Sequence, residues 1–242
     1  NRDVEVFPVL KAMFEKISGV SPYQSPTDMG VNMAGHCIID DEVVQAAASQ
    51  EIIRRFYQTQ CDRRKGDATD AMVQKTDILM QKAGLSIADR PVVKAANIRA
   101  EESGGPASAI EMPDGAILSA KTSSLLGASS AMIFDALKYL AGIDDSVKLL
   151  SPEIIEPIME LKVNYLGNHN PLLHIDEILI AMSIEAITNP VAKAAYAKLP
   201  ELRGLEVHSS VILSQVDIGV FKKLGINLTC EPKYENKKFF HM

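Results

Sequence analysis

The stretch from residue 109 to 140 constrains the fold more than any other part of the sequence. It begins with two short runs of strand-forming residues, 109–112 and 116–120, on either side of the tripeptide Pro-Asp-Gly. Proline presets φ for a turn, and Asp-Gly tolerates the positive φ that tight hairpins need. The sequence therefore predicts a β-hairpin here. The apolar residues that follow at helical spacing predict a helix packed closely against a sheet.

Four polar residues join the predicted hairpin to this helix: Lys121, Thr122, Ser123 and Ser124. Thr122 or Ser123 is expected to be the N-cap, because a side-chain hydroxyl can accept from a free N–H group of the first turn. The start of a helix also carries unpaired N–H groups and a partial positive charge, to which Lys121 adds a full charge. We therefore expect these four residues to bind an anion. The alternative is an ordinary capped helix beside a solvated lysine.

The spacing of Gly115, Ala120, Lys121 and Thr122 differs by one residue from the phosphate-loop pattern G-x-x-x-x-G-K-[ST]. The hairpin already explains Gly115, and the four residues after it resemble a strand rather than a compact loop. A nucleotide-hydrolysing phosphate loop is therefore disfavoured at this position.

Composition argues against several classes of partner. The 242 residues carry a net charge of −6, which gives no reason to expect nucleic acid. With no Trp and 5% aromatic residues, the chain also offers few platforms for base stacking. No apolar run reaches membrane-spanning length and no signal peptide is visible, so we expect no membrane partner.

The cysteines indicate a reducing compartment. Cys37, Cys61 and Cys230 are odd in number and far apart, a pattern typical of reduced thiols in the cytoplasm. No C-x-x-C, H-E-x-x-H or deaminase-type zinc motif is present, so no metal site is predicted. The sequence starts at Asn1 without an initiator Met, and we expect it to be part of a longer protein.

The predicted fold class is α/β, with a layered mixed-sheet α/β domain and an all-helical subdomain. Gly-Gly-Pro at 104–106 is the clearest boundary. Residues 1–39 are expected to add a helix and a strand to the α/β part, and residues 40–103 to form the helical subdomain.

The α/β domain is expected to span 104–232, followed by a polar tail at 233–242. Its last part reads as a strand at 205–213, a helix at 215–224 and a strand at 226–230. This order predicts a right-handed crossover between two parallel strands.

The acid–base candidates lie in two places. Asn168 belongs to a polar loop ahead of a helix whose start carries His174 and Asp176, and a histidine with carboxylates beside a loop suits proton transfer. Ordinary turn and helix-start chemistry explains the same residues without a function. His208 lies on an otherwise apolar predicted strand, where a structural histidine is the alternative. We take His174, Asp176 and His208 as candidate catalytic residues and Asn168 as a candidate ligand-binding residue.

Several stretches resemble an uncharacterised bacterial family known only as domain of unknown function eighteen forty-six. They are NRDVEVFPVL at the start, SPTDMGVNMAG at 25–35, QEIIRRFYQ at 50–58, KTSSLLGASSA at 121–131, GLEVHSSVIL at 204–213 and LGINLTCEPKY at 224–234. The resemblance implies that this chain is the C-terminal half of a longer protein. The missing N-terminal half, which carries a glycine-rich segment like a phosphate loop, would then be its partner. The resemblance also implies a helical piece beside a three-layer α/β piece, and it assigns no catalytic residue.

Two hypotheses follow from these observations. The leading one is an enzyme that binds a phosphate-containing ligand in a cleft shared with the phosphate-loop-like N-terminal half, since clefts between domains are common ligand sites. The alternative is a non-catalytic domain for ligand sensing or oligomerisation. Under both we expect a cytoplasmic homo-oligomer, and the sequence names no cofactor.

Overall fold

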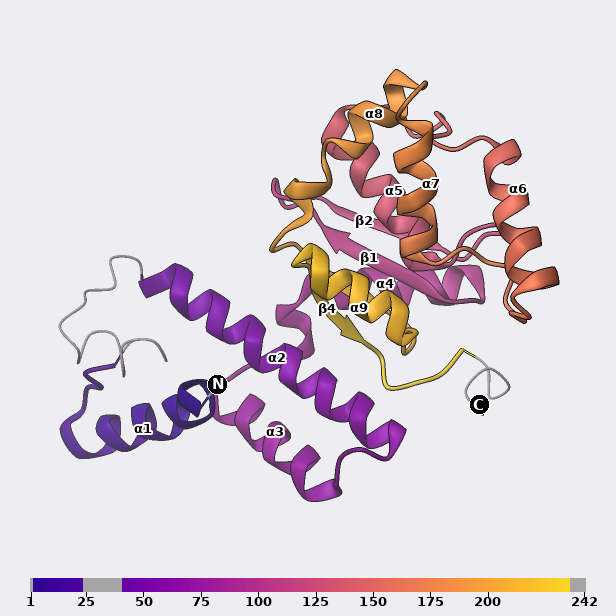
Figure 1. Ribbon diagram of the computed structural model, residues 1–242. Coiled ribbons are helices and arrows are strands. Elements are labelled where there is room, and N and C mark those ends of the chain that lie inside the picture. Colours follow the sequence, from indigo (N-terminus) through magenta and orange to yellow (C-terminus); the bar gives the residue numbers. More distant parts are fainter. Residues whose placement is uncertain (1, 24–40, 236–242) are drawn as a thin grey trace. The chain divides into compact units, whose positions relative to one another are not determined.

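The computed structural model describes residues 2–23 and 41–235. The chain divides into two compact units, Asn1–Arg90 and Pro91–Met242, and each is described by itself (Figure 1). The strand expected within residues 31–39 and the last part of the expected tail lie outside the described residues.

The described part of unit 1 is helical. It contains α1 (Arg2–Ser18), α2 (Asp41–Lys65), α3 (Asp70–Lys82) and a short 3-10 turn, η1 (Ile87–Asp89). In α2, Ile53, Tyr57 and Cys61 recur every four residues and are buried, so the helix presents one apolar stripe to the unit. Thr69 caps α3 by accepting the N–H of Met72 at 3.4 Å.

Unit 2 is a mixed sheet with helices on both faces. Its elements are α4 (Pro91–Ser103), β1 (Ala107–Glu111), β2 (Ile117–Lys121), α5 (Ala128–Ala141), α6 (Pro152–Glu160), the π-helical turn η2 (Leu161–Tyr165), α7 (Ile175–Glu185), α8 (Pro190–Tyr196), the 3-10 turn η3 (Leu199–Leu202), β3 (Glu206–Ser209), α9 (Gln215–Leu224) and β4 (Asn227–Cys230). The strand order is β2-β1-β3-β4. The α/β fold class predicted from the sequence is confirmed.

The predicted hairpin and the predicted strand pair both form, but β3 covers only Glu206–Ser209 of the strand expected at 205–213. β1 and β2 form an antiparallel hairpin whose turn closes with Gly115 at φ 84° and a hydrogen bond from the Met112 N–H to the Ala116 carbonyl. β3 and β4 are parallel and α9 connects them, as the strand–helix–strand order predicted. β1 is antiparallel to β3 as well, so β2, β3 and β4 all run in one direction.

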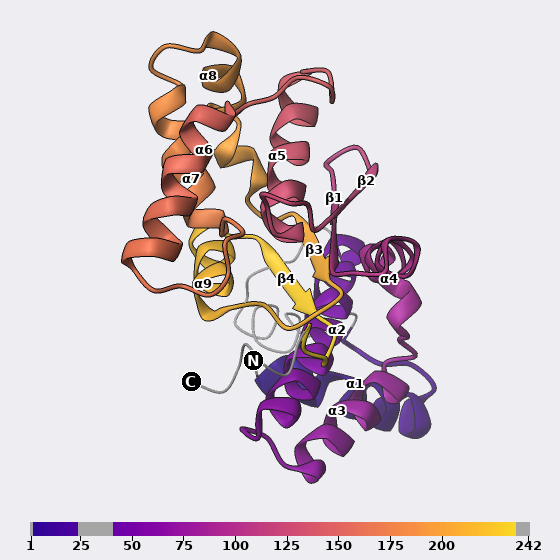
Figure 2. The same cartoon turned by 90° about the vertical axis from the view of Figure 1, so that its right-hand side faces the viewer.

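The two faces of the sheet carry different helices. Ala109 of β1 packs with Val92 and Ala96 of α4 on one face. On the other face Ile110 of β1 and Val207 of β3 join the main core beneath α5, α7 and α9. Figure 2 shows the sheet between α4 and the layer that contains α5.

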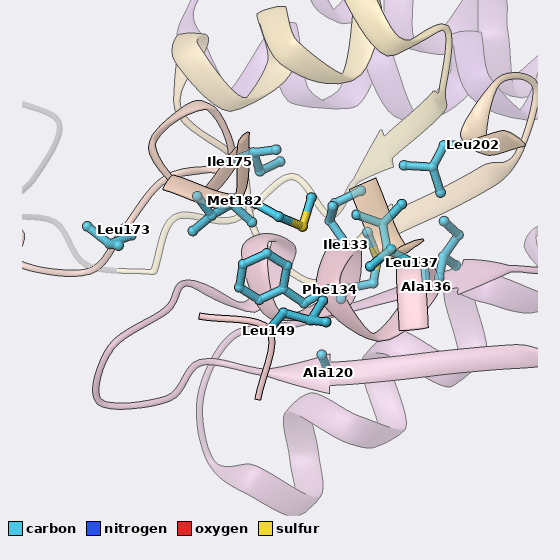
Figure 3. Packing of buried hydrophobic residues seen from close by; sticks show 14 of the residues in the cluster. Ala120, Ile133, Phe134, Ala136, Leu137, Leu149, Leu173, Ile175, Met182 and Leu202 are labelled. Atoms are coloured by element: carbon cyan, nitrogen blue, oxygen red, sulfur yellow. The ribbon is translucent and has the colours of Figure 1, made fainter. Parts of the chain in front are cut away.

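The main core of unit 2 lies between the sheet and α5. α5 buries Met132, Ile133 and Leu137 completely, and it buries residues on more than one side. In Figure 3 the side chains of Phe134 and Leu149 lie over Ala120 of β2. The core therefore holds the start of α5 close to the ends of the strands.

The predicted start of α5 is wrong by several residues. The helix begins at Ala128 with Gly127 as N-cap, and neither Thr122 nor Ser123 caps it. The Thr122 N–H instead donates to the Pro106 carbonyl at 3.0 Å, next to the last pair of the β-ladder. The Ser123 hydroxyl accepts the N–H of Leu126 at 2.9 Å, so the connection turns locally before the helix begins.

The boundary between the units lies before α4 rather than at the Gly-Gly-Pro segment. The reason is packing, because α4 covers one face of the sheet through Val92 and Ala96. The helical pattern of 91–103 does not reveal this, since the apolar stripe of a helix looks the same whether it packs on helices or on a sheet.

Candidate functional site

The carboxyl ends of β2 and β3 border a cavity of about 760 Å³ within unit 2. Thr122 follows β2 and Ser209 ends β3, and both residues line the cavity. Open α/β sheets commonly bind ligands beyond the carboxyl ends of their strands. The position of the cavity therefore marks it as a candidate ligand site.

The start of α5 forms one wall of this cavity, from Gly127 to Ser130. Gly127 is the N-cap and has no side chain that could accept from the first turn. Across the described part of the chain, the N–H groups of Ala128, Ser129 and Ser130 make no hydrogen bond. Three unpaired N–H donors and the positive end of a helix dipole favour an anion at this wall.

Buried hydroxyl groups line the same cavity. The Ser129 and Ser108 hydroxyl oxygens lie 3.0 Å apart and share one hydrogen bond, which uses only one of their two protons. Ser209 is 1% exposed and its hydroxyl accepts the Val211 N–H at 3.4 Å. It donates to no other group among the described residues, so its proton is available to a ligand oxygen.

The loop that leads into α7 forms the opposite wall and is tied to α5. Leu173 donates its N–H to the Leu125 carbonyl at 3.0 Å, and its own carbonyl accepts the Ser130 hydroxyl at 2.9 Å. The Lys162 ammonium, 2% exposed, reaches the Leu172 carbonyl at 2.6 Å and the Glu177 carboxylate at 2.8 Å. These bonds fix the backbone on both sides of His174, so its ring is held next to the start of α5.

His174 and Asp217 form a hydrogen-bonded pair in this cavity. Nδ1 of His174 lies 2.9 Å from the Asp217 carboxylate, which also accepts the N–H of Ile175 at 3.1 Å and the Ser214 hydroxyl at 2.8 Å. Both members of the pair line the cavity. In the described part of the chain, Nε2 of His174 makes no hydrogen bond, so it is the nitrogen open to a ligand.

The pair shifts the pKa of both groups toward their charged forms. The hydrogen bond that His174 donates to Asp217 raises the pKa of His174 above its usual value, although burial acts in the opposite direction. Burial alone would raise the pKa of Asp217, but the hydrogen bond and charge of His174 outweigh it, and the net pKa is lowered. An ionised Asp217 accepts a hydrogen bond from the Nδ1–H group, so the proton of neutral His174 stays on Nδ1. Nε2 then presents its lone pair to the cavity.

Sequence reasoning missed Asp217 and the serines of α5. Asp217 is 43 residues from His174, and its only local signal is the capping pattern that it forms with Ser214, three residues earlier. In the sequence, Ser129 and Ser130 look like small residues in the interior of a helix. They line the cavity because α5 begins only at Ala128, and the sequence did not predict that start.

The structure does not bring His208 together with His174. Residues of a strand alternate between faces, so Ser209 lies on the cavity side and His208 on the α4 side. The His208 ring is 0% exposed, with Nδ1 2.8 Å from the Thr229 hydroxyl and Nε2 3.3 Å from the Glu231 carboxylate, which also accepts the Asn97 amide. These contacts describe a structural histidine that links β3, β4 and α4.

The remaining sequence candidates divide into two groups. Thr122 and Asn168 line the cavity with His174. Asp176 lies outside the lining, and its carboxylate accepts the Glu177 N–H at 2.9 Å. Lys121 is the exposed last residue of β2, Ser123 and Ser124 are exposed on the connection to α5, and all three are outside the lining.

The described residues contain neither a metal-ligand cluster nor a membrane-spanning helix. Within 2–23 and 41–235, no three His, Cys, Asp or Glu side chains are placed to hold a metal ion together. Cys61 and Cys230 are buried and form no disulfide bond with each other, and Cys37 lies outside the described residues. No helix described here is long and apolar enough to cross a membrane.

Two family models match the chain. Residues 88–240 match "Domain of unknown function DUF1846, C-terminal", and residues 1–84 match "Domain of unknown function DUF1846, N-terminal". The chain belongs to the DUF1846 family. Similar curated proteins include "UPF0371 protein cu0538" of Corynebacterium urealyticum, 54% identical over 99% of this chain and 48% of that protein. Another is "UPF0371 protein str1377" of Streptococcus thermophilus, 49% identical over 99% of this chain and 49% of that protein.

The family match corrects one prediction. The chain was expected to be only the C-terminal half of a DUF1846 protein, with the N-terminal half missing and acting as its partner. That prediction is wrong, because residues 1–84 match the N-terminal model. The resemblance was drawn from scattered segments, which identify a family but not the part of it that each segment represents. The chain spans about half the length of the curated DUF1846 relatives that it matches.

Proposed function

We propose that the α/β unit binds a small phosphate-containing molecule in the cavity beside His174, and that His174 acts on this molecule as a general acid–base. The observation that carries the proposal is the His174–Asp217 pair in the cavity wall, with Nδ1 held at 2.9 Å. A histidine oriented in this way by a carboxylate can take a proton at Nε2 and return it.

The start of α5 supports phosphate as the anchoring group. The unpaired N–H groups of Ala128, Ser129 and Ser130 suit the oxygens of a phosphate, and the hydroxyls of Ser129 and Ser209 add donors. Leu173 is bonded to the α5 start and precedes His174, so an anion bound there lies near the His174 ring.

The reaction that this arrangement suits best is hydrolysis of a phosphate monoester. A water molecule gives a proton to Nε2 of His174 while its oxygen bonds to phosphorus and the ester P–O bond breaks. The imidazolium, stabilised by Asp217, then returns the proton to the leaving oxygen, and the products are an alcohol and inorganic phosphate. No serine hydroxyl of the described residues lies within hydrogen-bond distance of the His174 ring, which favours water over serine as the nucleophile.

The test measures binding and turnover on the full chain. Titration calorimetry with inorganic phosphate should show saturable binding that weakens about 10- to 150-fold in His174→Ala, since a charge-assisted hydrogen bond contributes about 1.5–3 kcal/mol. Hydrolysis of p-nitrophenyl phosphate should fall about 10²–10⁴-fold in the same variant. Asp145→Asn is the control, because Asp145 is exposed and does not line the cavity. Its phosphate affinity and hydrolysis rate should equal those of the parent protein.

Three outcomes separate the possibilities. Phosphate binding with turnover that depends on His174 supports the proposal. Binding without turnover of any phosphate monoester contradicts the acid–base role and favours the non-catalytic, ligand-sensing alternative. Absence of phosphate binding contradicts the proposal as a whole.

A further inference from the structure

We infer that the ligand is the monophosphate of a sugar or another polyol and not a nucleotide. The inference rests on the proposed function, because it takes the α5 start as the phosphate site. Size does not decide between these classes, since a volume of about 760 Å³ accommodates either one. The chemistry of the lining residues distinguishes a sugar monophosphate from a nucleotide.

Charge limits the ligand to one phosphate group. Among the described residues, neither Lys nor Arg lines the cavity. Its two basic side chains are His169 and His174, and the hydrogen bond to Asp217 raises the pKa of His174. Asp217 and Glu235 add carboxylates to the same lining. Diphosphate and triphosphate groups normally bind to several cations or to a lysine-bearing phosphate loop. The single helix start of α5 therefore suits a single phosphate.

The absence of Phe, Tyr and Trp from the described lining disfavours a nucleobase. Among the described residues, the lining includes no Phe, Tyr or Trp, and its aromatic rings are the imidazoles of His169 and His174. Proteins that bind bases commonly stack them on aromatic side chains or on the planes of Arg guanidinium groups. The described lining offers only two imidazoles for this, and one of them, His174, is assigned to the phosphate.

The polar lining residues match hydroxyl groups instead. A sugar hydroxyl both donates and accepts, so it is best met by side chains that do the same. Hydroxyl and amide side chains from separate segments line the cavity: Thr122, Ser129, Asn168, Asn170, Ser209 and Ser214. The aliphatic residues between them suit the C–H faces of a sugar ring, which are apolar.

The Asn168–Asn170 segment is held in place without using all of its amide groups. The Asn168 N–H donates to the Lys162 carbonyl at 3.0 Å, and the Asn170 side-chain oxygen accepts the Leu172 N–H at 3.1 Å. The side chain of Asn168 makes no hydrogen bond within the described residues. This amide is therefore held on a fixed backbone with its full bonding capacity available, which reduces the entropic cost of binding a ligand.

The experiment compares four probes by calorimetry on the full chain: inorganic phosphate, glucose 6-phosphate, AMP and ADP. Glucose 6-phosphate should bind at least tenfold more tightly than inorganic phosphate, while AMP and ADP should show no such gain. Asn168→Ala should remove several-fold of the glucose 6-phosphate affinity and leave the affinity for inorganic phosphate unchanged. Asn164→Ala, an exposed asparagine outside the lining, is the matched control and should change neither affinity.

The outcomes separate this inference from the proposed function. If phosphate binds but glucose 6-phosphate gains nothing, or if AMP binds more tightly than the sugar phosphate, the inference is overturned and the proposed function stands. If none of the four probes binds, the proposed function fails and the inference fails with it. Unchanged glucose 6-phosphate affinity in Asn168→Ala also contradicts the inference, because the predicted hydroxyl contact is then absent.

Discussion

Asp217 connects the candidate site to α9, because its carboxylate meets donors from three places. It accepts from the His174 ring, from the Ile175 N–H at the start of α7, and from the Ser214 hydroxyl that caps α9. A carboxylate that accepts several hydrogen bonds stays ionised when partly buried. The same residue therefore sets the tautomer of His174 and joins two helix starts.

The pH dependence of stability follows from this pair. The raised pKa of His174 adds stability that is fully present below its unfolded pKa of about 6.5 and is lost as pH rises through the folded pKa. The lowered pKa of Asp217 adds stability above about pH 4 that is lost as pH falls through its folded pKa. The pair therefore stabilises the fold most between about pH 4 and 6.5.

We predict that Asp217→Asn lowers the pKa of His174, because it removes the charge and the main hydrogen-bond acceptor of the ring. The measurement is an NMR titration of the histidine ring protons, with urea unfolding at pH 5.5 and 8.5. The stability lost in the variant should be larger at pH 5.5. A His174 pKa that is the same in both proteins would mean that the pair does not form in solution.

Lys162 gives a second prediction at this scale. Its ammonium is buried against Glu177 and the Leu172 carbonyl, so Lys162→Met leaves two acceptors without their donor. The variant should lose about 1–3 kcal/mol of unfolding free energy. Lys198→Met breaks an exposed pair with Glu201 and should cost less than about 1 kcal/mol. Equal losses in urea unfolding would contradict the structural role of Lys162.

At the scale of elements, the sequence predicted those helices, strands and turns that are determined by residues adjacent in the chain. The hairpin around Gly115 and the β3–α9–β4 crossover were found because turn residues and apolar periodicity are local signals. The start of α5 was misplaced, because hydroxyl residues at 122–124 suit a cap and a turn equally well. The His174–Asp217 pair was not predicted, since it depends on tertiary packing between segments 43 residues apart.

Gly127 provides a test of the α5 start as an anion site. Its φ of −63° suits any residue, and an added Cβ would meet only the Leu173 carbonyl at 3.9 Å. Gly127→Asp should therefore fold, and its carboxylate should cap the free N–H groups and add a few tenths of a kcal/mol to the unfolding free energy.

The same carboxylate should exclude phosphate, so we predict that phosphate affinity in Gly127→Asp falls at least about tenfold. Ser151→Asp adds a carboxylate at the N-cap of α6, outside the cavity lining, and is the matched control. Calorimetry measures the phosphate affinity of both variants, and only that of Gly127→Asp should fall. Undiminished phosphate binding in Gly127→Asp would place the phosphate elsewhere.

At the scale of the whole molecule, the candidate site belongs to one unit. Every described residue that lines the cavity lies within Pro91–Met242, and residues 88–240 match the C-terminal DUF1846 model. Unit 2 also contains its own core between the sheet and α5. The structural basis of the proposed function is therefore contained in unit 2.

We predict that a fragment of residues 88–242 folds cooperatively and binds phosphate within about twofold of the affinity of the full chain, a difference of less than about 0.5 kcal/mol. Urea unfolding followed by fluorescence or circular dichroism tests the fold, and calorimetry tests binding. A folded fragment that has lost phosphate affinity would show that residues of unit 1 contribute to the site.

The central claim is that phosphate binds between the α5 start and His174. The most direct measurement is an NMR titration of the isotope-labelled full chain with inorganic phosphate, which follows the backbone amides and histidine rings. We predict saturable shifts at the amides of Ala128, Ser129 and Ser130 and at the His174 ring, all with one dissociation constant. Saturable shifts confined to other residues, or no saturable shift at these four, would contradict the claim.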